Sequence, residues 1–150
     1  MTDPISFTSA TTRFSLPFLF AAQAQKEFFV NEALARVDAL LHPVIEGELN
    51  APPVVPVDGK SWLVGAVPTG EWVGHSGDIA SRQAGEWLYA DPVPGMQLFD
   101  LTADKRAVFD GSWKRAAQMT QPSGGTVIDA QARTAIAGLI AALVSAGILA

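Results

Sequence analysis

Glycine–tryptophan steps divide the middle of this chain into short segments and constrain its fold more than any other feature. Trp72, Trp87 and Trp113 each stand two residues after a glycine, and Trp62 stands three residues after Gly59. Asp-Gly pairs, which suit tight turns between antiparallel strands, occur at 58–59 and 110–111. Short β-type runs lie at 61–65, 86–90, 96–101 and 107–109. The pattern predicts a small antiparallel sheet of about five or six strands.

Changes in pattern divide the 150 residues into three zones. An N-terminal segment with an amphipathic helix covers 1–50, a small β domain covers 51–119, and a flexible break with an apolar helix covers 120–150. Hydrophobic residues make up 49% of the chain and charged residues 17%, which is a globular composition. We therefore predict an α+β fold, in which an N-terminal helix, a Trp-rich antiparallel sheet and a C-terminal apolar helix follow one another.

The first predicted helix, over 21–44, carries a regular apolar stripe. Its members recur at spacings of 4, 3, 4 and 3 residues, which is a two-heptad helix–helix seam. They are Val30, Leu34, Val37, Leu41 and Val44. Two interpretations remain open: the stripe packs on the chain's own domain, or it joins copies of the chain. Pro43 disfavours helical geometry at His42 and so limits the helix at its C-terminal end.

The residues before this helix raise the question of export. Residues 14–22 are mostly apolar, and the small residues at 22 and 24 are similar to a signal-peptidase site. Against export, Pro17 interrupts the apolar run, and the one preceding Arg, Arg13, is offset by Asp3. We therefore favour a buried N-terminal segment that leads into the helix.

The C-terminal segment 134–150 contains no charged residue. Asp129 is a good N-cap for a helix there, and Gly147 is placed to end it. Five large aliphatic residues form one broad face: Ile136, Leu139, Ile140, Leu143 and Val144. We favour a helix that is buried in an oligomer. The alternatives are a tail that becomes ordered on a partner and a membrane span, which is disfavoured because glycine and serine interrupt the segment and no cation follows it.

Few residues of this chain could carry chemistry. There is no cysteine, and the two histidines, His42 and His75, are too few for a zinc site. His75, Ser76 and Asp78 are neighbours in sequence, whereas a nucleophilic triad needs groups that converge from separate elements. A net charge of −5 without a basic run argues against nucleic acid as a partner. We therefore predict no catalytic residue, no metal and no cofactor, and we expect a protein that is not an enzyme.

The aromatic residues of the middle zone are the candidates for ligand binding. Aromatic rings on a sheet can stack on the apolar faces of sugar rings, and the residues placed for this are Trp72, Trp87 and Tyr89. The competing interpretation, which we favour, places the tryptophan rings in the core, because this zone has few other large apolar residues.

Several strings within residues 12–115 resemble a known family. In order, they are Leu-Pro at 16–17, Gln-Ala-Gln-Lys-Glu at 23–27, Asn-Glu-Ala-Leu at 31–34, Asp-Ala-Leu at 38–40, a proline-rich junction at 51–56, Gly-x-x-Trp at 59–62 and Asp-Gly-Ser-Trp at 110–113. They are similar to an uncharacterised domain family of alphaproteobacterial prophages and gene transfer agents, whose members are described as phage tail-fibre or host-specificity proteins. The resemblance implies that 21–27 belongs to a helix and is not a cleavage site.

The resemblance also implies a virion component that is made in the bacterial cytoplasm and leaves the cell on the particle. We therefore expect a structural protein of a phage-like particle that serves as the oligomeric base or adaptor of a head spike or tail fibre. Its partners would be itself, as a trimer or pentamer, and other virion proteins. The alternatives are a carbohydrate-binding module that recognises host surface polysaccharide and a membrane-anchored protein.

Overall fold

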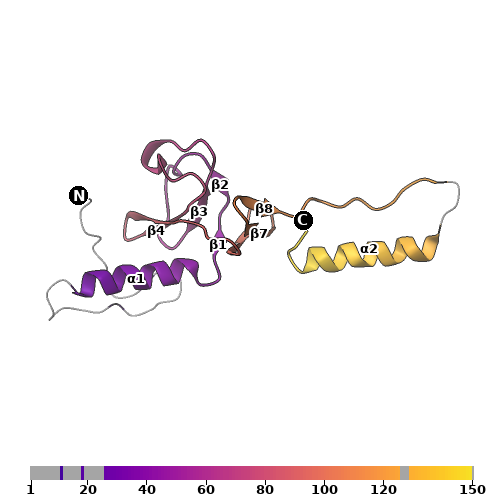
Figure 1. The fold of residues 1–150 in the computed structure, drawn as a ribbon, viewed down its shortest axis with the longest axis horizontal. Coiled ribbons are helices and arrows are strands. Elements are labelled where there is room, and N and C mark those ends of the chain that lie inside the picture. Colours follow the sequence, from indigo (N-terminus) through magenta and orange to yellow (C-terminus); the bar gives the residue numbers. More distant parts are fainter. Residues whose placement is uncertain (1–10, 12–17, 19–25, 126–128, 150) are drawn as a thin grey trace. The chain divides into compact units, whose positions relative to one another are not determined.

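The computed structural model describes Thr11, Phe18, residues 26–125 and residues 129–149 (Figure 1). The interpretations of 12–25 as an export signal or as a buried segment fall outside these residues, except for Phe18, which is buried. Two helices stand before and after a region of short strands, which confirms the predicted α+β class. In chain order the elements are α1 (Lys26–Leu40), β1 (Val44–Ile45), β2 (Glu48–Leu49), β3 (Ser61–Val64), the 3-10 turn η1 (Gly70–Trp72), β4 (Ile79–Gln83), β5 (Glu86–Ala90), β6 (Gln97–Asp100), β7 (Lys105–Phe109), β8 (Trp113–Arg115) and α2 (Ala130–Ser145).

The chain forms two compact units, Met1–Pro92 and Val93–Ala150. The first contains α1 and the strands up to β5, and the second contains β6, β7, β8 and α2. The zone predicted as one β domain, 51–119, is thus shared between the two units. The three-zone division at 1–50, 51–119 and 120–150 remains a description of the sequence pattern.

In the first unit, strands β2, β3, β4 and β5 form a sheet in that order. The β2–β3 pair is parallel and the other two pairs are antiparallel. Because successive side chains of a strand point to opposite faces, Trp62 and Val64 lie on one face and Ser61 and Leu63 on the other. All four of these residues are buried, since α1 covers one face and a cluster of aromatic side chains covers the other.

The second unit contains the antiparallel strands β6, β7 and β8. Ala107 of β7 and Leu98 of β6 are paired across the ladder and both are buried. Arg115 of β8 forms an ion pair with the buried carboxylate of Asp100, with 2.7 Å between Nη2 and Oδ2. The other oxygen of Asp100 accepts a hydrogen bond from the Ala103 amide, so this side chain fixes the turn between β6 and β7.

The predicted strands at 61–65, 86–90, 96–101 and 107–109 correspond to β3, β5, β6 and β7. The prediction missed β1, β2, β4 and β8, and the strands form two four-stranded sheets instead of one sheet of five or six. The sequence of β4, Ile-Ala-Ser-Arg-Gln, is largely polar. It is nevertheless buried along most of its length, because β3 and β5 flank it and side chains of both faces are covered. Gly59 and Gly111 of the two predicted Asp-Gly turns have φ values of 81° and 72°, a conformation that favours glycine.

Helix α1 ends at Leu40, four residues before the predicted end. His42 has a φ of 52°, so the chain leaves the helix directly before Pro43. Val44 therefore lies in strand β1 and not on the helical stripe, which corrects its assignment to the seam.

Both predicted ends of the C-terminal helix are confirmed. Asp129 caps α2, because its Oδ1 accepts a hydrogen bond from the Ala132 amide at 2.9 Å. Gly147 has a φ of 67° and donates to the Val144 carbonyl, and the next amide, that of Ile148, donates to the Leu143 carbonyl. These two bonds form a Schellman motif, which ends the helix.

Candidate functional site

The aromatic cluster on the sheet of the first unit is the first candidate site. Trp62, Val64, Trp72 and Ala80 form its buried part, and Trp87 and Tyr89 pack against them. The Trp87 ring meets the rings of Trp62 and Trp72 edge to face, with centroids 5.7 and 5.2 Å apart. Such pairs stabilise a core beyond the area that they bury.

Trp72 is completely buried, with 0% of its surface exposed. Its ring is therefore closed to a sugar in this structure, which corrects its assignment as a sugar contact. The loop that contains η1 places Trp72 against the sheet, where its ring forms part of the buried cluster. Trp72 thus has the core role that the sequence analysis favoured for the tryptophans.

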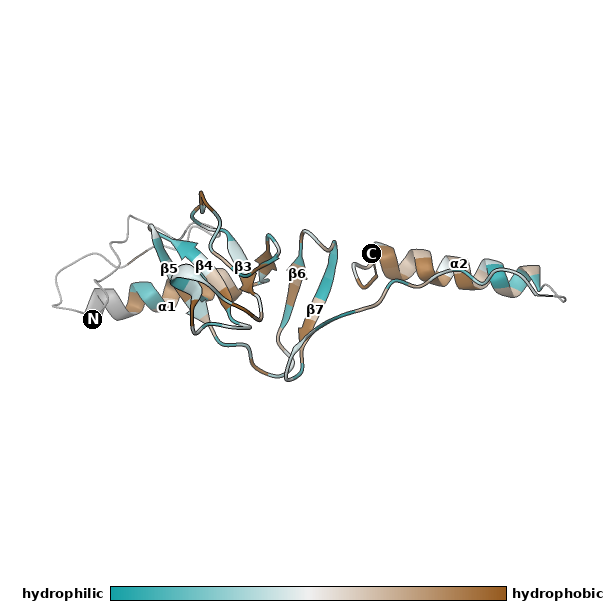
Figure 2. Ribbon diagram, turned by 90° about the horizontal axis from the view of Figure 1, so that it is seen from above, coloured by the Kyte–Doolittle hydropathy of each residue, from teal (hydrophilic) through white to brown (hydrophobic). Residues whose placement is uncertain are grey.

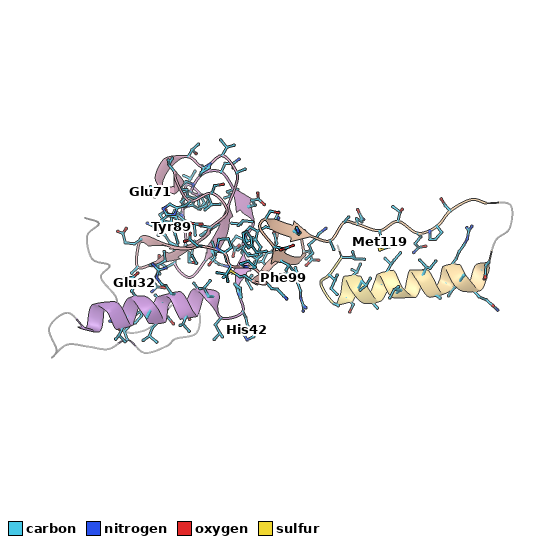
Figure 3. All side chains as sticks on the ribbon, in the orientation of Figure 1. Glu32, His42, Glu71, Tyr89, Phe99 and Met119 are labelled. Atoms are coloured by element: carbon cyan, nitrogen blue, oxygen red, sulfur yellow. The ribbon has the colours of Figure 1, made fainter. Side chains whose placement is uncertain are left out.

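Trp87 and Tyr89 are only partly buried, but their polar groups bind within the chain. Trp87 Nε1 donates to Glu71 Oε2 at 2.9 Å, and the Tyr89 hydroxyl donates to the Glu71 carbonyl at 2.8 Å. Figure 3 shows Glu71 and Tyr89 on neighbouring parts of this cluster. The Arg82 guanidinium lies 5.0 Å from the centre of the Trp87 ring, at a cation–π distance. A ligand that stacks on Trp87 from this side would have to displace Arg82.

His75 lies beside the same cluster. Its ring stacks on Tyr89, with centroids 3.5 Å apart and planes inclined by 4°. Its Nδ1 is 2.9 Å from Oδ2 of Asp78, a residue that is 6% exposed. The proximity of His75 to Asp78 follows from their spacing of three residues, but no sequence pattern indicated the stack on Tyr89, fourteen residues away.

The titration behaviour of these residues follows from their burial. Burial raises the pKa of Asp78, the His75 hydrogen bond opposes this, and the nearby Asp91 adds to it. Burial raises the pKa of Tyr89 to about 12, and the negative charge of Glu71 contributes to this rise. Burial thus disfavours the charged form of both groups. Among the described residues, no group of three or more His, Cys, Asp or Glu side chains could hold a metal ion.

The outer face of α1 is the second candidate site. The helix turns small and polar side chains toward the sheet: Asn31, Ala35, Asp38 and Ala39 are all buried. The stripe lies elsewhere on the helix, since Val30, Val37 and Leu41 are exposed, Val37 by 50%, and Leu34 is half-buried. The chain's own sheet thus does not bury this stripe.

Hydrogen bonds fix which face of α1 meets the sheet. Arg36 donates from Nη1 to the Tyr89 carbonyl at the edge strand β5, and its other guanidinium nitrogens donate to Glu32. Opposite Ala35 and Ala39, Ser61 and Ser81 share a hydrogen bond of 2.8 Å. Small side chains on both sides allow the helix to approach the sheet closely, and this leaves its larger aliphatic residues outside.

Helix α2 is the third candidate site, and none of its residues is buried. Of its five large aliphatic residues, Leu139 is the most exposed, at 61%, and Ile140 and Leu143 are half-buried. Figure 2 shows that hydrophobic residues dominate this helix toward its C-terminal end. No helix among the described residues is both long enough and apolar enough to span a membrane.

The end of α2 is attached to the sheet of the second unit. The Arg106 amide of β7 donates to the Gly147 carbonyl at 2.8 Å, and Leu149 is buried. A Cβ atom on Gly147 would lie 3.0 Å from the Phe99 ring, so glycine is needed here for space as well as for its positive φ. The helix is therefore held at its C-terminal end while the surface along its length stays open.

These features define a small α+β protein whose two helices expose apolar faces. The chain matches a family described as a protein of unknown function, DUF2793, over residues 30–114. This match covers more than half of the 150 residues, so the chain belongs to that family. The matched part runs from α1 to β8 and leaves α2 outside it. No curated protein matches the chain.

Proposed function

We propose that this protein is a non-enzymatic structural component of a phage-like particle, a gene transfer agent or a prophage particle. In this proposal it joins copies of itself and serves as the base or adaptor of a head spike or tail fibre. The observation that carries the proposal is the surface of α2, a helix of 16 residues without charge after Arg133 and without a buried residue. A helix with such a surface is normally buried in a larger assembly.

The outer face of α1 supports the same role. Val30, Val37 and Leu41 form a second exposed apolar surface, on a helix that the sheet already holds from its other side. Exposed apolar residues that gather on one helix face are typical of interaction surfaces. A protein with two such surfaces can contact copies of itself through one and another virion protein through the other.

The link to phage-like particles is supported by the sequence strings at 23–27, 31–34 and 110–113, which resemble domains of prophages and gene transfer agents. The non-enzymatic part is supported by the arrangement of His75 and Asp78. They bind each other within one turn, and Tyr89 covers one face of the imidazole. This arrangement stabilises the loop over Trp72, which is a structural role.

The carbohydrate-binding alternative has less support. It requires aromatic rings with free faces and free polar groups, whereas Trp72 is buried and the polar atoms of Trp87 and Tyr89 bind Glu71. Trp87 and Tyr89 are the residues through which a glycan would still have to act. Quenching of tryptophan fluorescence by host capsular polysaccharide, lost in Trp87→Ala, would revive this alternative.

The proposal is tested in the strain that encodes the protein. Particles are released, treated with nuclease, purified on a density gradient and analysed by quantitative mass spectrometry. We expect the chain in the DNA-containing fraction at a fixed ratio to the capsid protein. We expect Leu139→Asp to lower this ratio and the matched variant Ala141→Asp to preserve it, since residue 141 lies on the opposite side of α2. Absence of the wild-type chain from purified particles would refute the proposal.

A further inference from the structure

The aliphatic residues of α2 follow the spacing of a helix–helix seam. Ile136, Leu139 and Leu143 are separated by 3 and 4 residues, and Ala132 and Ala146 continue the same spacing at the two ends. The other positions between 134 and 145 are mostly alanine and glycine, which let a second helix approach closely. The surface is thus suited to another helix of similar shape.

The described part of the chain leaves this surface largely exposed: Ile136 and Leu139 are exposed, and Leu143 is half-buried. The contacts of α2 lie at its ends, where Arg133 donates to the carbonyls of Pro122 and Gly124 and where Gly147 accepts from Arg106. None of the helical residues between these ends is buried. Among the described residues, the seam is therefore not buried along about three turns of helix.

We propose that α2 packs in parallel and in register against α2 of further copies of this chain, through Ile136, Leu139 and Leu143. This inference rests on the assembly role proposed above and names the partner and the geometry of that interface. Ile140 widens the seam on one side, so the bundle accommodates more than two helices.

A second copy is the occupant that the charges favour. The segment 134–150 has no charge, so identical helices meet without repulsion, and nothing on the segment would select a charged partner. Helices that lie on membrane surfaces have lysine and arginine on their polar face, and α2 has only Arg133, at its N-terminal end. That arginine already binds the carbonyls of the preceding loop.

The same charges favour the parallel orientation. Asp129 and Arg133 both lie at the N-terminal end of the helix. In a parallel bundle, the Asp129 and Arg133 groups of neighbouring copies lie at one end, where opposite charges attract and water is available. In an antiparallel pair these charges would lie against the uncharged C-terminal end of the partner helix, at a cost in desolvation.

The absence of cysteine makes the geometry directly testable. Three single variants of the full-length chain are compared under mild oxidation: Ala132→Cys and Ala146→Cys at the two ends of the seam, and Ala141→Cys on the opposite side. All three replace an exposed alanine. We expect the two seam variants to form disulfide-linked dimers at least ~10-fold faster than Ala141→Cys, because a shared seam raises the effective thiol concentration to the millimolar range.

An equal mixture of Ala132→Cys and Ala146→Cys separates the two orientations. In a parallel bundle each variant cross-links with its own kind in preference to the other. Preferential formation of the mixed 132–146 species would overturn the parallel arrangement. Equal rates for all three variants, together with a monomeric native mass of the wild-type chain, would overturn the interface itself.

Two further readouts keep the interpretation unambiguous. Leu139→Asp is expected to weaken self-association at least ~100-fold. It should leave the thermal unfolding temperature of the two units unchanged, because Leu139 is solvent-exposed. Flotation of the wild-type chain with neutral phosphatidylcholine vesicles, without cross-linking, would assign α2 to lipid and overturn the proposal. If the seam cross-links but the chain is absent from particles, the particle role fails and this interface stands. If the chain is present in particles but the seam does not cross-link, the interface fails and the particle role stands.

Discussion

The two helices of this protein are nearly equal in length, 15 and 16 residues, but they are held in different ways. Helix α1 lies against a sheet through Ala35 and Ala39, and Arg36 ties it to the backbone of β5. Helix α2 has no buried residue and is attached through its ends. Contacts within its own unit thus fix the position of α1, whereas the described part of the chain buries no residue of α2.

The most regular apolar stripe of a helix is thus not always the face that packs internally. In α1 the stripe residues Val37 and Leu41 are exposed, while small and polar residues meet the sheet. Close approach of backbones and satisfied hydrogen bonds can determine the packed face when both surfaces carry small residues, as Ser61 and Ser81 do here. The larger aliphatic residues of both helices then remain at least partly exposed.

The largest expected effect comes from the buried aromatic cluster of the first unit, which packs on the same sheet as α1. Trp72→Ala removes a completely buried ring and should lower the free energy of unfolding of the first unit by about 3–5 kcal/mol. The neighbouring exposed residue supplies the control, because Val73→Ala should change it by less than ~0.5 kcal/mol. Urea unfolding followed by tryptophan fluorescence measures both. A loss below ~1 kcal/mol for Trp72→Ala would mean that the ring is not part of the core.

The packed face of α1 can be tested with a matched pair of alanines. Ala35→Leu forces three extra carbon atoms between the helix and the sheet and should cost about 1–3 kcal/mol of unfolding free energy. Ala33→Leu adds the same atoms on an exposed position and should change stability by less than ~0.5 kcal/mol. Thermal or urea unfolding distinguishes them. Equal effects of the two variants would show that α1 is not docked through this face.

The attachment of α2 is tested by two glycines of the same segment. Gly147→Ala should destabilise the helix end by about 1–2 kcal/mol, because residue 147 has a positive φ and faces the Phe99 ring. Gly138→Ala lies in open helix and should stabilise α2 by about 0.5–1 kcal/mol. Amide hydrogen exchange at Leu143, Val144 and Ile148 reports both changes. Effects of the same sign would contradict the two different environments.

The smallest expected effect is a titration that reports only the first unit. Tyr89 is the single tyrosine, and burial, with help from Glu71, raises its pKa to about 12 from the ordinary 10.0. The unfolded chain releases this proton first, so the stabilising contribution is complete below pH 10 and is lost as the pH rises toward 12. Ultraviolet absorbance of the phenolate measures the pKa directly.

Two variants sharpen that titration. Glu71→Gln should lower the pKa of Tyr89, because it removes a nearby negative charge. Leu139→Asp lies on α2, in the other unit, and should leave the pKa of Tyr89 unchanged. Titration of the folded wild-type protein near the ordinary value would show that the ring is not held in the aromatic cluster.

Part of the candidate site was accessible from sequence and part was not. The apolar stripe of α1 was found from its spacing, but its last member was misplaced, because Pro43 and the left-handed His42 end the helix before Val44. The aromatic residues were recognised as a group. Their separate fates, with Trp72 inside and Trp87 under Arg82, depend on a loop that folds back over the sheet.

The sequence by itself determined the features that depend on neighbouring residues. Asp129 and Gly147 define the ends of α2 through hydrogen bonds that span three to five residues. The glycine turns and β-type runs likewise determined the α+β class, because turn geometry and strand propensity are local properties.

Only the tertiary structure decided which surfaces are covered. Contacts between residues far apart in the chain cover these surfaces. Examples are the stack of His75 on Tyr89, the hydrogen bond from Arg36 to the Tyr89 carbonyl and the packing that buries Ala35. No local pattern specifies such contacts, because they depend on how closely two elements can approach and on which polar groups find partners there. The exposed faces of α1 and α2 are what remains after those contacts have formed.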